Sequence, residues 1–181
     1  MAGNYIYFAG SLPMLFFGET PSLSLSDFDE AAQRLTDPHT AQMLRQAVLY
    51  TSDTTGLPAD ICKFYDWETA LRNALLDVRK KFRVNAVDCK RGNPDFYSEI
   101  PATVTQAANA PDLLEAEKIL DRARFQALEY LSAGHYFDLE FLMLYRIKLQ
   151  ILEKYLPRTP EAGNRALEQI LENVMNTSKT N

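Results

Sequence analysis

The fold is decided by the stretch from Pro111 to Leu156, which reads PDLLEAEKILDRARFQALEYLSAGHYFDLEFLMLYRIKLQILEKYL. Gly134 divides it into two segments with helical spacing of apolar residues. The first carries a seam at alternating steps of three and four, made of Leu113, Ala116, Leu120, Ala123, Ala127 and Tyr130. The second carries two neighbouring stripes: Phe141, Leu144, Ile151 and Tyr155, and Leu142, Tyr145, Leu149, Leu152 and Leu156. A helix that is apolar over most of its circumference packs against several partners, so the stretch predicts the interior of a helical bundle.

Further helices are predicted along most of the chain. One begins at a cap formed by Ser26, another has Pro38 at its first position, and a strongly amphipathic one runs from Trp67 to Phe82. Thr159-Pro160 predicts the start of a last helix, whose Leu167, Ile170, Leu171 and Val174 would close over the hairpin. Tyr5 to Phe8 is the one segment that could form a strand. We therefore expect an all-α bundle of about six helices in two lobes.

The expected domain organisation follows from where the helical pattern weakens. Between Val84 and Ala110 it dissolves, apart from a short helix that Pro101 could begin. The predicted parts are an extended or loop segment packing on the bundle (1–25), a first helical lobe (26–91), a linker (92–110), a second helical lobe (111–176) and a disordered tail (177–181).

Composition limits the class of protein. The chain has 181 residues and a formal net charge of -5, which is unlike the basic surplus of a dedicated nucleic-acid binder. Cys62 and Cys89 lack metal-type spacing and indicate buried or free thiols in a reducing compartment, with a disulfide as the alternative. The apolar run from Tyr5 to Gly18 has no basic residue before it, unlike a signal peptide. We expect a soluble, cytoplasmic protein.

No catalytic or metal-binding constellation is predicted, and we expect neither a cofactor nor enzyme activity. His39 and His135 have no ligand partner at metal-type spacing, and His135 is expected to satisfy the last carbonyls of a helix. Acidic and basic residues alternate after Pro111, which predicts a solvated face with i,i+4 pairs; the alternative is an acid-base pair. These residues are Glu115, Glu117, Asp121, Lys118, Arg122 and Arg124.

One basic cluster is a candidate contact site for a partner. It consists of Arg79, Lys80, Lys81, Arg83, Lys90 and Arg91. Cations at the end of a helix favour its dipole, which is the simplest interpretation. The cluster could also bind an acidic protein, or nucleic acid or anionic lipid. Few aromatic residues are interleaved, which argues against single-stranded nucleic acid.

Several short motifs carry a family resemblance. They are Glu117 to Leu128, Phe137 to Leu142 followed by Arg146, Trp67-Glu68, and Leu71-Arg72-Asn73. Together they resemble the C-type stalk component (d-type in eukaryotes) of V/A-type rotary ATPases. The N-terminal YIYFAGSLP, from Tyr5 to Pro13, is more similar to an uncharacterised bacterial family encoded beside V-type ATPase genes. The chain departs from the C-type component in having room for about two lobes rather than three, and in Gly10-Ser11 where a basic residue is usual.

The resemblance implies a non-catalytic structural or coupling component, or an accessory protein, between the central stalk and the membrane ring. The implied partners are stalk or ring subunits, and the protein would be cytoplasmic or peripheral on the inner membrane through a complex. The basic cluster would then contact a partner. Two other classes stay open: a general helical scaffold or assembly factor without an ATPase role, and an enzyme with an unrecognised site.

Overall fold

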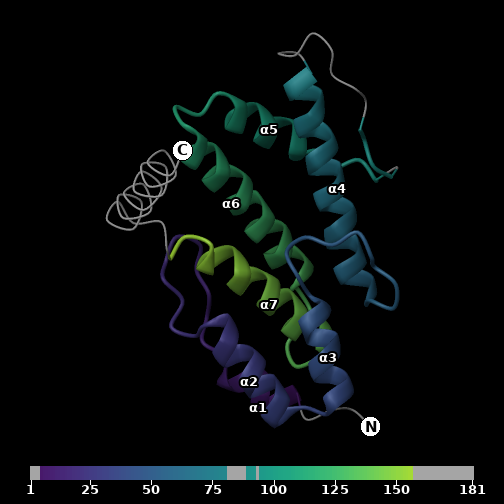
Figure 1. The fold of residues 1–181 in the computed structure, drawn as a ribbon, viewed down its shortest axis with the longest axis vertical. Helices are drawn as coiled ribbons and strands as arrows, with labels where there is room; N and C mark the ends of the chain where they lie inside the picture. Colours follow the sequence, from purple (N-terminus) through teal and green to yellow (C-terminus); the bar gives the residue numbers. More distant parts are fainter. Residues whose placement is uncertain (1–4, 81–88, 93, 157–181) are drawn as a thin grey trace, which may run out of the picture.

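The computed structural model describes residues 5–80, 89–92 and 94–156, and every regular element in these ranges is a helix. The helices are α1 (Tyr5–Ser11), α2 (Leu25–Leu35), α3 (Pro38–Gln46), α4 (Ala59–Lys80), α5 (Ile100–Ala108), α6 (Leu113–Leu131) and α7 (Leu139–Glu153). Figure 1 shows them packed into one bundle. The predicted all-α class is therefore confirmed.

Helix α7 holds the bundle together. It packs against α1, α2 and α3 on one side and against α4 and α6 on the other, and it lies between these groups in Figure 1. Among the described helices, no other one packs against both groups. Its buried residues cover most of its circumference: Leu142, Met143, Leu144, Tyr145, Arg146, Ile147, Leu149, Ile151 and Leu152. The interior position predicted for this segment is confirmed.

The seam predicted for α6 is correct in its middle and wrong at its ends. Leu113 and Tyr130, which began and ended that seam, are 84% and 82% exposed. The middle of the seam, Leu120, Ala123 and Ala127, is half-buried against the core, as predicted. The fully buried positions are Asp121, Arg124, Phe125 and Leu128. The seam was predicted from apolar residues alone, whereas Asp121 and Arg124 can be buried because they neutralise each other across one turn.

Two predictions near the N-terminus were wrong. Tyr5–Ser11 is helix rather than strand, because Tyr5, Phe8, Ala9 and Leu12 recur at helical spacing and pack on the core. Helix α2 is capped by Ser24 rather than by Ser26. Ser24 Oγ accepts from the backbone N–H of Asp27 at 3.1 Å, and the Asp27 carboxylate accepts from the backbone N–H of Ser24 at 3.3 Å. This reciprocal capping box satisfies two N–H groups, and it leaves Ser26 inside the first turn.

The middle of the chain contributes more than a linker. Helix α5 lies within the predicted linker at 92–110, begins next to Pro101 as expected, and packs against α4 and α6. The division into lobes at this point stays a prediction. The last predicted helix, from Thr159-Pro160, and the tail at 177–181 lie outside the described residues. Within the described part of the chain, no helix combines the length and apolarity that a bilayer crossing requires.

Candidate functional site

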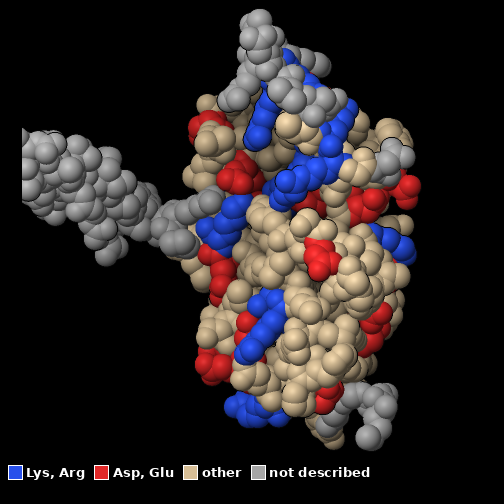
Figure 2. Space-filling model, turned by 45° about the vertical axis from the view of Figure 1, so that its right-hand side comes forward, with Lys and Arg blue, Asp and Glu red and all other residues tan. Residues whose placement is uncertain are grey.

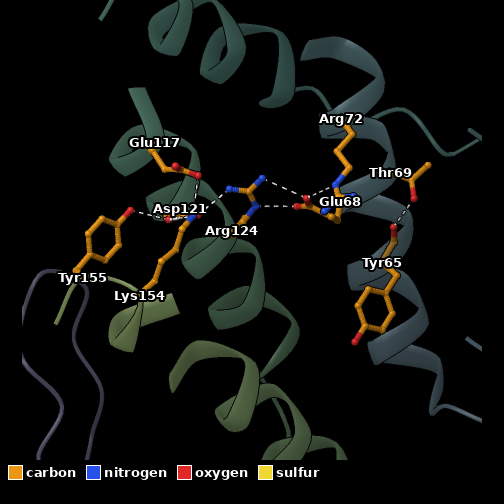
Figure 3. A network of polar contacts seen from close by, with 9 residues as sticks. All are labelled: Tyr65, Glu68, Thr69, Arg72, Glu117, Asp121, Arg124, Lys154 and Tyr155. Carbon is orange, nitrogen blue, oxygen red and sulfur yellow. Dashed lines mark hydrogen bonds and ion pairs between the residues drawn. The ribbon is translucent and has the colours of Figure 1, made fainter. Parts of the chain in front are cut away.

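A buried network of charged side chains joins α4 to α6. Arg124 of α6 donates from Nε to Glu68 Oε2 at 2.8 Å and from Nη2 to Glu68 Oε1 at 3.2 Å, so the pair is bidentate. Its Nη1 donates to Asp121 Oδ1 at 2.7 Å. Asp121, Glu68 and Arg124 are 0%, 4% and 5% exposed. Figure 3 shows the guanidinium between the two carboxylates. Burial disfavours the charged guanidinium, but the hydrogen bonds and charge of Glu68 outweigh it and raise the pKa of Arg124.

The same network continues from α6 to the end of α7. Asp121 Oδ2 accepts from Lys154 Nζ at 2.9 Å and from the Tyr155 hydroxyl at 2.6 Å. Lys154 also donates to Glu117 Oε1 at 2.7 Å. Burial opposes the charge of Lys154, but its hydrogen bonds to Glu117 and Asp121 raise its pKa. Three helices are thus connected through charges that satisfy one another (Figure 3).

The solvated face predicted for α6 is correct only in part. Glu115 and Lys118 do form an exposed i,i+3 pair at 3.8 Å. Asp121 and Arg124 are buried, because each has a counter-charge from elsewhere in the chain: Glu68 of α4 for Arg124, and Lys154 for Asp121. Both oxygens of Asp121 accept hydrogen bonds from neighbouring donors, so its geometry is that of a structural ion pair.

A second buried arginine connects α7 to the first group of helices. Arg146 donates to both carboxylate oxygens of Asp29 in α2, from Nε at 2.8 Å and from Nη2 at 2.9 Å. Its Nη1 donates to the Ala47 carbonyl at 2.7 Å, just after α3. Gln150 adds a bond to the same carbonyl at 2.8 Å. Bidentate guanidinium–carboxylate pairs fix orientation as well as distance. Arg146 therefore holds α7 to the first group of helices, while Lys154 and Tyr155 connect the end of α7 to Asp121 of α6.

The prediction that His135 satisfies the last carbonyls of a helix is wrong for its side chain, which contacts two carboxylates instead. Its Nδ1 lies 2.6 Å from Asp138 Oδ2 and its Nε2 lies 2.9 Å from Asp60 Oδ2. Asp138 is the N-cap of α7 and Asp60 lies in the first turn of α4, so the imidazole bridges two helix starts. The hydrogen bond to Asp138 raises the pKa of His135 despite partial burial. Ligand atoms of His135, Asp138 and Glu140 lie within 4.8 Å of one another. Both imidazole nitrogens are already occupied by carboxylates, so we interpret the group as an ion pair.

The basic cluster is divided by the structure. Arg79 and Arg91 line a cavity of about 760 Å³ between α4, the 50–54 loop, the segment after residue 88 and α6. Lys90 forms an ion pair with Asp77 at 2.8 Å. Lys80 is in the last turn of α4. Lys81 and Arg83 lie outside the described residues. In Figure 2, basic side chains gather in the upper part of the molecule, where α4 ends.

Sequence reasoning missed the members of this site that come from other elements. In the sequence, Glu68 and Arg72 stand out only as parts of the motifs that carry the family resemblance, and no pattern marks Tyr50. Arg72 lies 4.5 Å from the centroid of the Tyr50 ring, and Arg124 lies 5.6 Å from it. The i,i+4 spacing of Glu68 and Arg72 was the available signal.

Comparison with protein-family models, curated proteins and solved structures found no match for this chain.

Proposed function

We propose that this chain is a non-catalytic structural or coupling component of a V/A-type rotary ATPase, connecting central-stalk and membrane-ring subunits. The observation that supports it best is the pair of buried arginines that fasten the bundle at two places. Arg124 joins α6 to α4, and Arg146 joins α7 to α2. Because the carboxylates of Asp121 and Glu68 are engaged by these contacts, they serve the connection between helices.

A component that transmits torque must resist bending. Helices packed only through apolar side chains can slide, since such contacts have little directionality. Bidentate ion pairs add directional constraints. One of them, between Arg146 and Asp29, acts on the helix that joins the two groups, and the other, between Arg124 and Glu68, joins α6 to α4. These constraints support the rigidity that a coupling role needs.

Exposed apolar residues near the N-terminus are the proposed contact with a partner. Ile6 and Tyr7 lie on α1 and are 62% and 73% exposed, while Met14 and Phe16 follow it and are 80% and 52% exposed. Protein interfaces are enriched in aromatic residues and methionine. Ile6 and Tyr7 also belong to the segment with the most distinctive family resemblance.

The basic cluster from Arg79 to Arg91 is a second proposed contact, with the acidic or polar rim of a partner protein. Charged groups at the rim of an interface mainly affect the association rate and its salt dependence. Its contribution should therefore be largest at low ionic strength.

The test is association of the purified chain with purified stalk and ring subunits, measured by biolayer interferometry at low salt. We expect Ile6→Ser/Tyr7→Ser to weaken binding at least about tenfold, as loss of interface hot spots does. The matched control is Leu113→Ser/Tyr130→Ser, which alters two apolar residues on α6 that are at least as exposed. Reversing the charges of the basic cluster should lower the association rate.

Three results would contradict the proposal. These are no binding to any ATPase subunit, an equal loss in the control variant, and an unchanged association rate after charge reversal. Binding to isolated subunits but not to the assembled complex would favour an assembly factor instead. A general helical scaffold would bind other proteins and none of these subunits.

A further inference from the structure

The cavity beside α4 is built around arginines. Its walls come from α4, the 50–54 loop, the segment containing Arg91, and α6. Its volume of about 760 Å³ lies in the range of small-molecule sites, which is roughly 300–1,000 Å³. Four arginines line it: Arg72, Arg79, Arg91 and Arg124.

Arg72 is held in a fixed orientation. Its Nε donates to Glu68 Oε1 at 2.8 Å, and its guanidinium lies over the Tyr50 ring. Among the described residues, no hydrogen bond engages its two terminal nitrogens. Such an edge presents parallel N–H donors at the spacing of two oxygens of a phosphate group. Because Glu68 and Tyr50 already restrain the side chain, little rotamer freedom would be lost on binding.

Arg91 is positioned from α4 by a side-chain amide. Asn73 Nδ2 donates to the Arg91 carbonyl at 2.8 Å, and Asn73 Oδ1 accepts from the Arg91 N–H at 3.0 Å. Next to it, Gly92 turns with a φ of 57°. The ion pair between Lys90 and Asp77 holds the same segment one residue earlier. The Arg91 side chain therefore starts from a backbone that is fixed against the cavity.

The acidic residues of the cavity are already engaged. Glu68 accepts from Arg72 and Arg124, Glu117 accepts from Lys154, and Asp66 accepts from the Asp95 N–H and the Tyr97 hydroxyl. Within the part of the chain that the structure describes, neither the Arg79 nor the Arg91 guanidinium has an ion-pair partner. Positive charge thus remains without a counter-ion in the cavity.

We propose that this cavity binds a small molecule that carries phosphate groups, with Arg72, Arg79 and Arg91 as its main ligands. The hydroxyls of Thr51 and Ser52 also line the cavity and could donate to further phosphate oxygens. A concave site favours a small ligand over an acidic peptide, because peptide and protein contacts are usually broader and flatter. This site shares Arg79 and Arg91 with the basic cluster proposed as a partner contact, but its test on the isolated chain requires no ATPase subunit.

The test is isothermal titration calorimetry on the isolated chain in about 150 mM salt, with inorganic phosphate, inorganic pyrophosphate and ATP as separate ligands. We expect saturable binding of pyrophosphate. Arg79→Gln/Arg91→Gln should weaken it at least about tenfold, since charged hydrogen bonds to both residues are lost. Both side chains are exposed, so the variant should fold, and its thermal unfolding by circular dichroism verifies this.

The matched control is Arg34→Gln/Arg45→Gln, which removes two exposed arginines from the last turns of α2 and α3. It should bind pyrophosphate like the unaltered chain. Tighter binding of ATP than of pyrophosphate would indicate a nucleotide, and equal binding would indicate recognition of the phosphates alone. Absence of saturable binding, or an equal loss in the control, would overturn the proposal. So would tighter binding of a glutamate-rich peptide than of pyrophosphate.

Discussion

Replacing Arg124 by methionine should be strongly destabilising, because it removes the shared cation of two buried carboxylates. Glu68 would lose the hydrogen bonds at 2.8 and 3.2 Å, and Asp121 would lose the one at 2.7 Å. Methionine has similar length and retains part of the packing, so the main effect of the variant is electrostatic.

The decrease in the free energy of unfolding depends on which hydrogen-bond donors Glu68 and Asp121 keep in the variant. Removing one partner of a buried ion pair costs about 3–5 kcal/mol. Glu68 would keep its contact with Arg72, and Asp121 would keep Lys154 and Tyr155. We therefore expect the lower end of that range, about 3 kcal/mol. For a chain of this length, such a loss lowers the melting temperature by roughly 6–12 °C.

The assay is urea unfolding at neutral pH, followed by circular dichroism at the helical band. Arg122→Met is the control, since Arg122 is exposed on the same helix and lies 5.3 Å from the Phe17 ring centroid. The control variant should lower the free energy of unfolding by less than about 1 kcal/mol, the usual contribution of an exposed cation–π contact. The double variant Glu68→Met/Arg124→Met should lose less than the sum of its single variants, because the charges disappear together. Equal losses for Arg124→Met and Arg122→Met would refute the reasoning.

Three further perturbations test other parts of the bundle. Leu144→Ala should lower the free energy of unfolding, measured with urea, by about 2–5 kcal/mol, because Leu144 is fully buried. A decrease below about 1 kcal/mol would contradict its place in the core. Gly134→Ala should lower the free energy of unfolding by roughly 1–2 kcal/mol, since a φ of 96° is unfavourable for residues with a Cβ. The effect comes from the backbone alone, because no neighbouring atom lies within 4 Å of a Cβ at this position. Unchanged stability would show that the turn can rearrange. Asp138 and Asp60 raise the pKa of His135 above its ordinary 6.5, so the protonated imidazole stabilises the fold below pH 6.5 and this contribution is lost as pH rises through the folded pKa. His135→Gln should therefore approach the unaltered chain in stability as pH rises, and a constant difference between about pH 5.5 and 8.5 would exclude the ion pair.

The helical class and the central position of α7 could be predicted because they depend on local patterns. A run such as Leu142 to Leu152 leaves hardly any polar face, whatever the rest of the chain does. Pro38 could likewise be placed at a helix start, since the cap is formed by its neighbour Asp37. These features need no knowledge of distant residues.

The charged interior could not be predicted in the same way. Asp121 and Arg124 stand three residues apart, as they would on a solvated helix face. Partners that are far away in the sequence complete the network: Glu68 pairs with Arg124, and Lys154 and Tyr155 donate to Asp121. The cavity has the same origin, because Tyr50, Arg72 and Arg91 come together only through tertiary packing. The basic cluster was visible in the sequence, but its division between an ion pair and the cavity was not.

The position of α7 also affects how the chain is completed on the ribosome. Helices α1 to α6 are all synthesised before it, yet among the described helices α7 alone packs against both groups, α1–α3 and α4–α6. At about 5–20 residues per second, the nascent chain waits several seconds between the emergence of α3 and that of α7. During this interval the apolar faces that pack on α7 in the finished fold are not yet covered by it, and transiently exposed apolar surface favours aggregation.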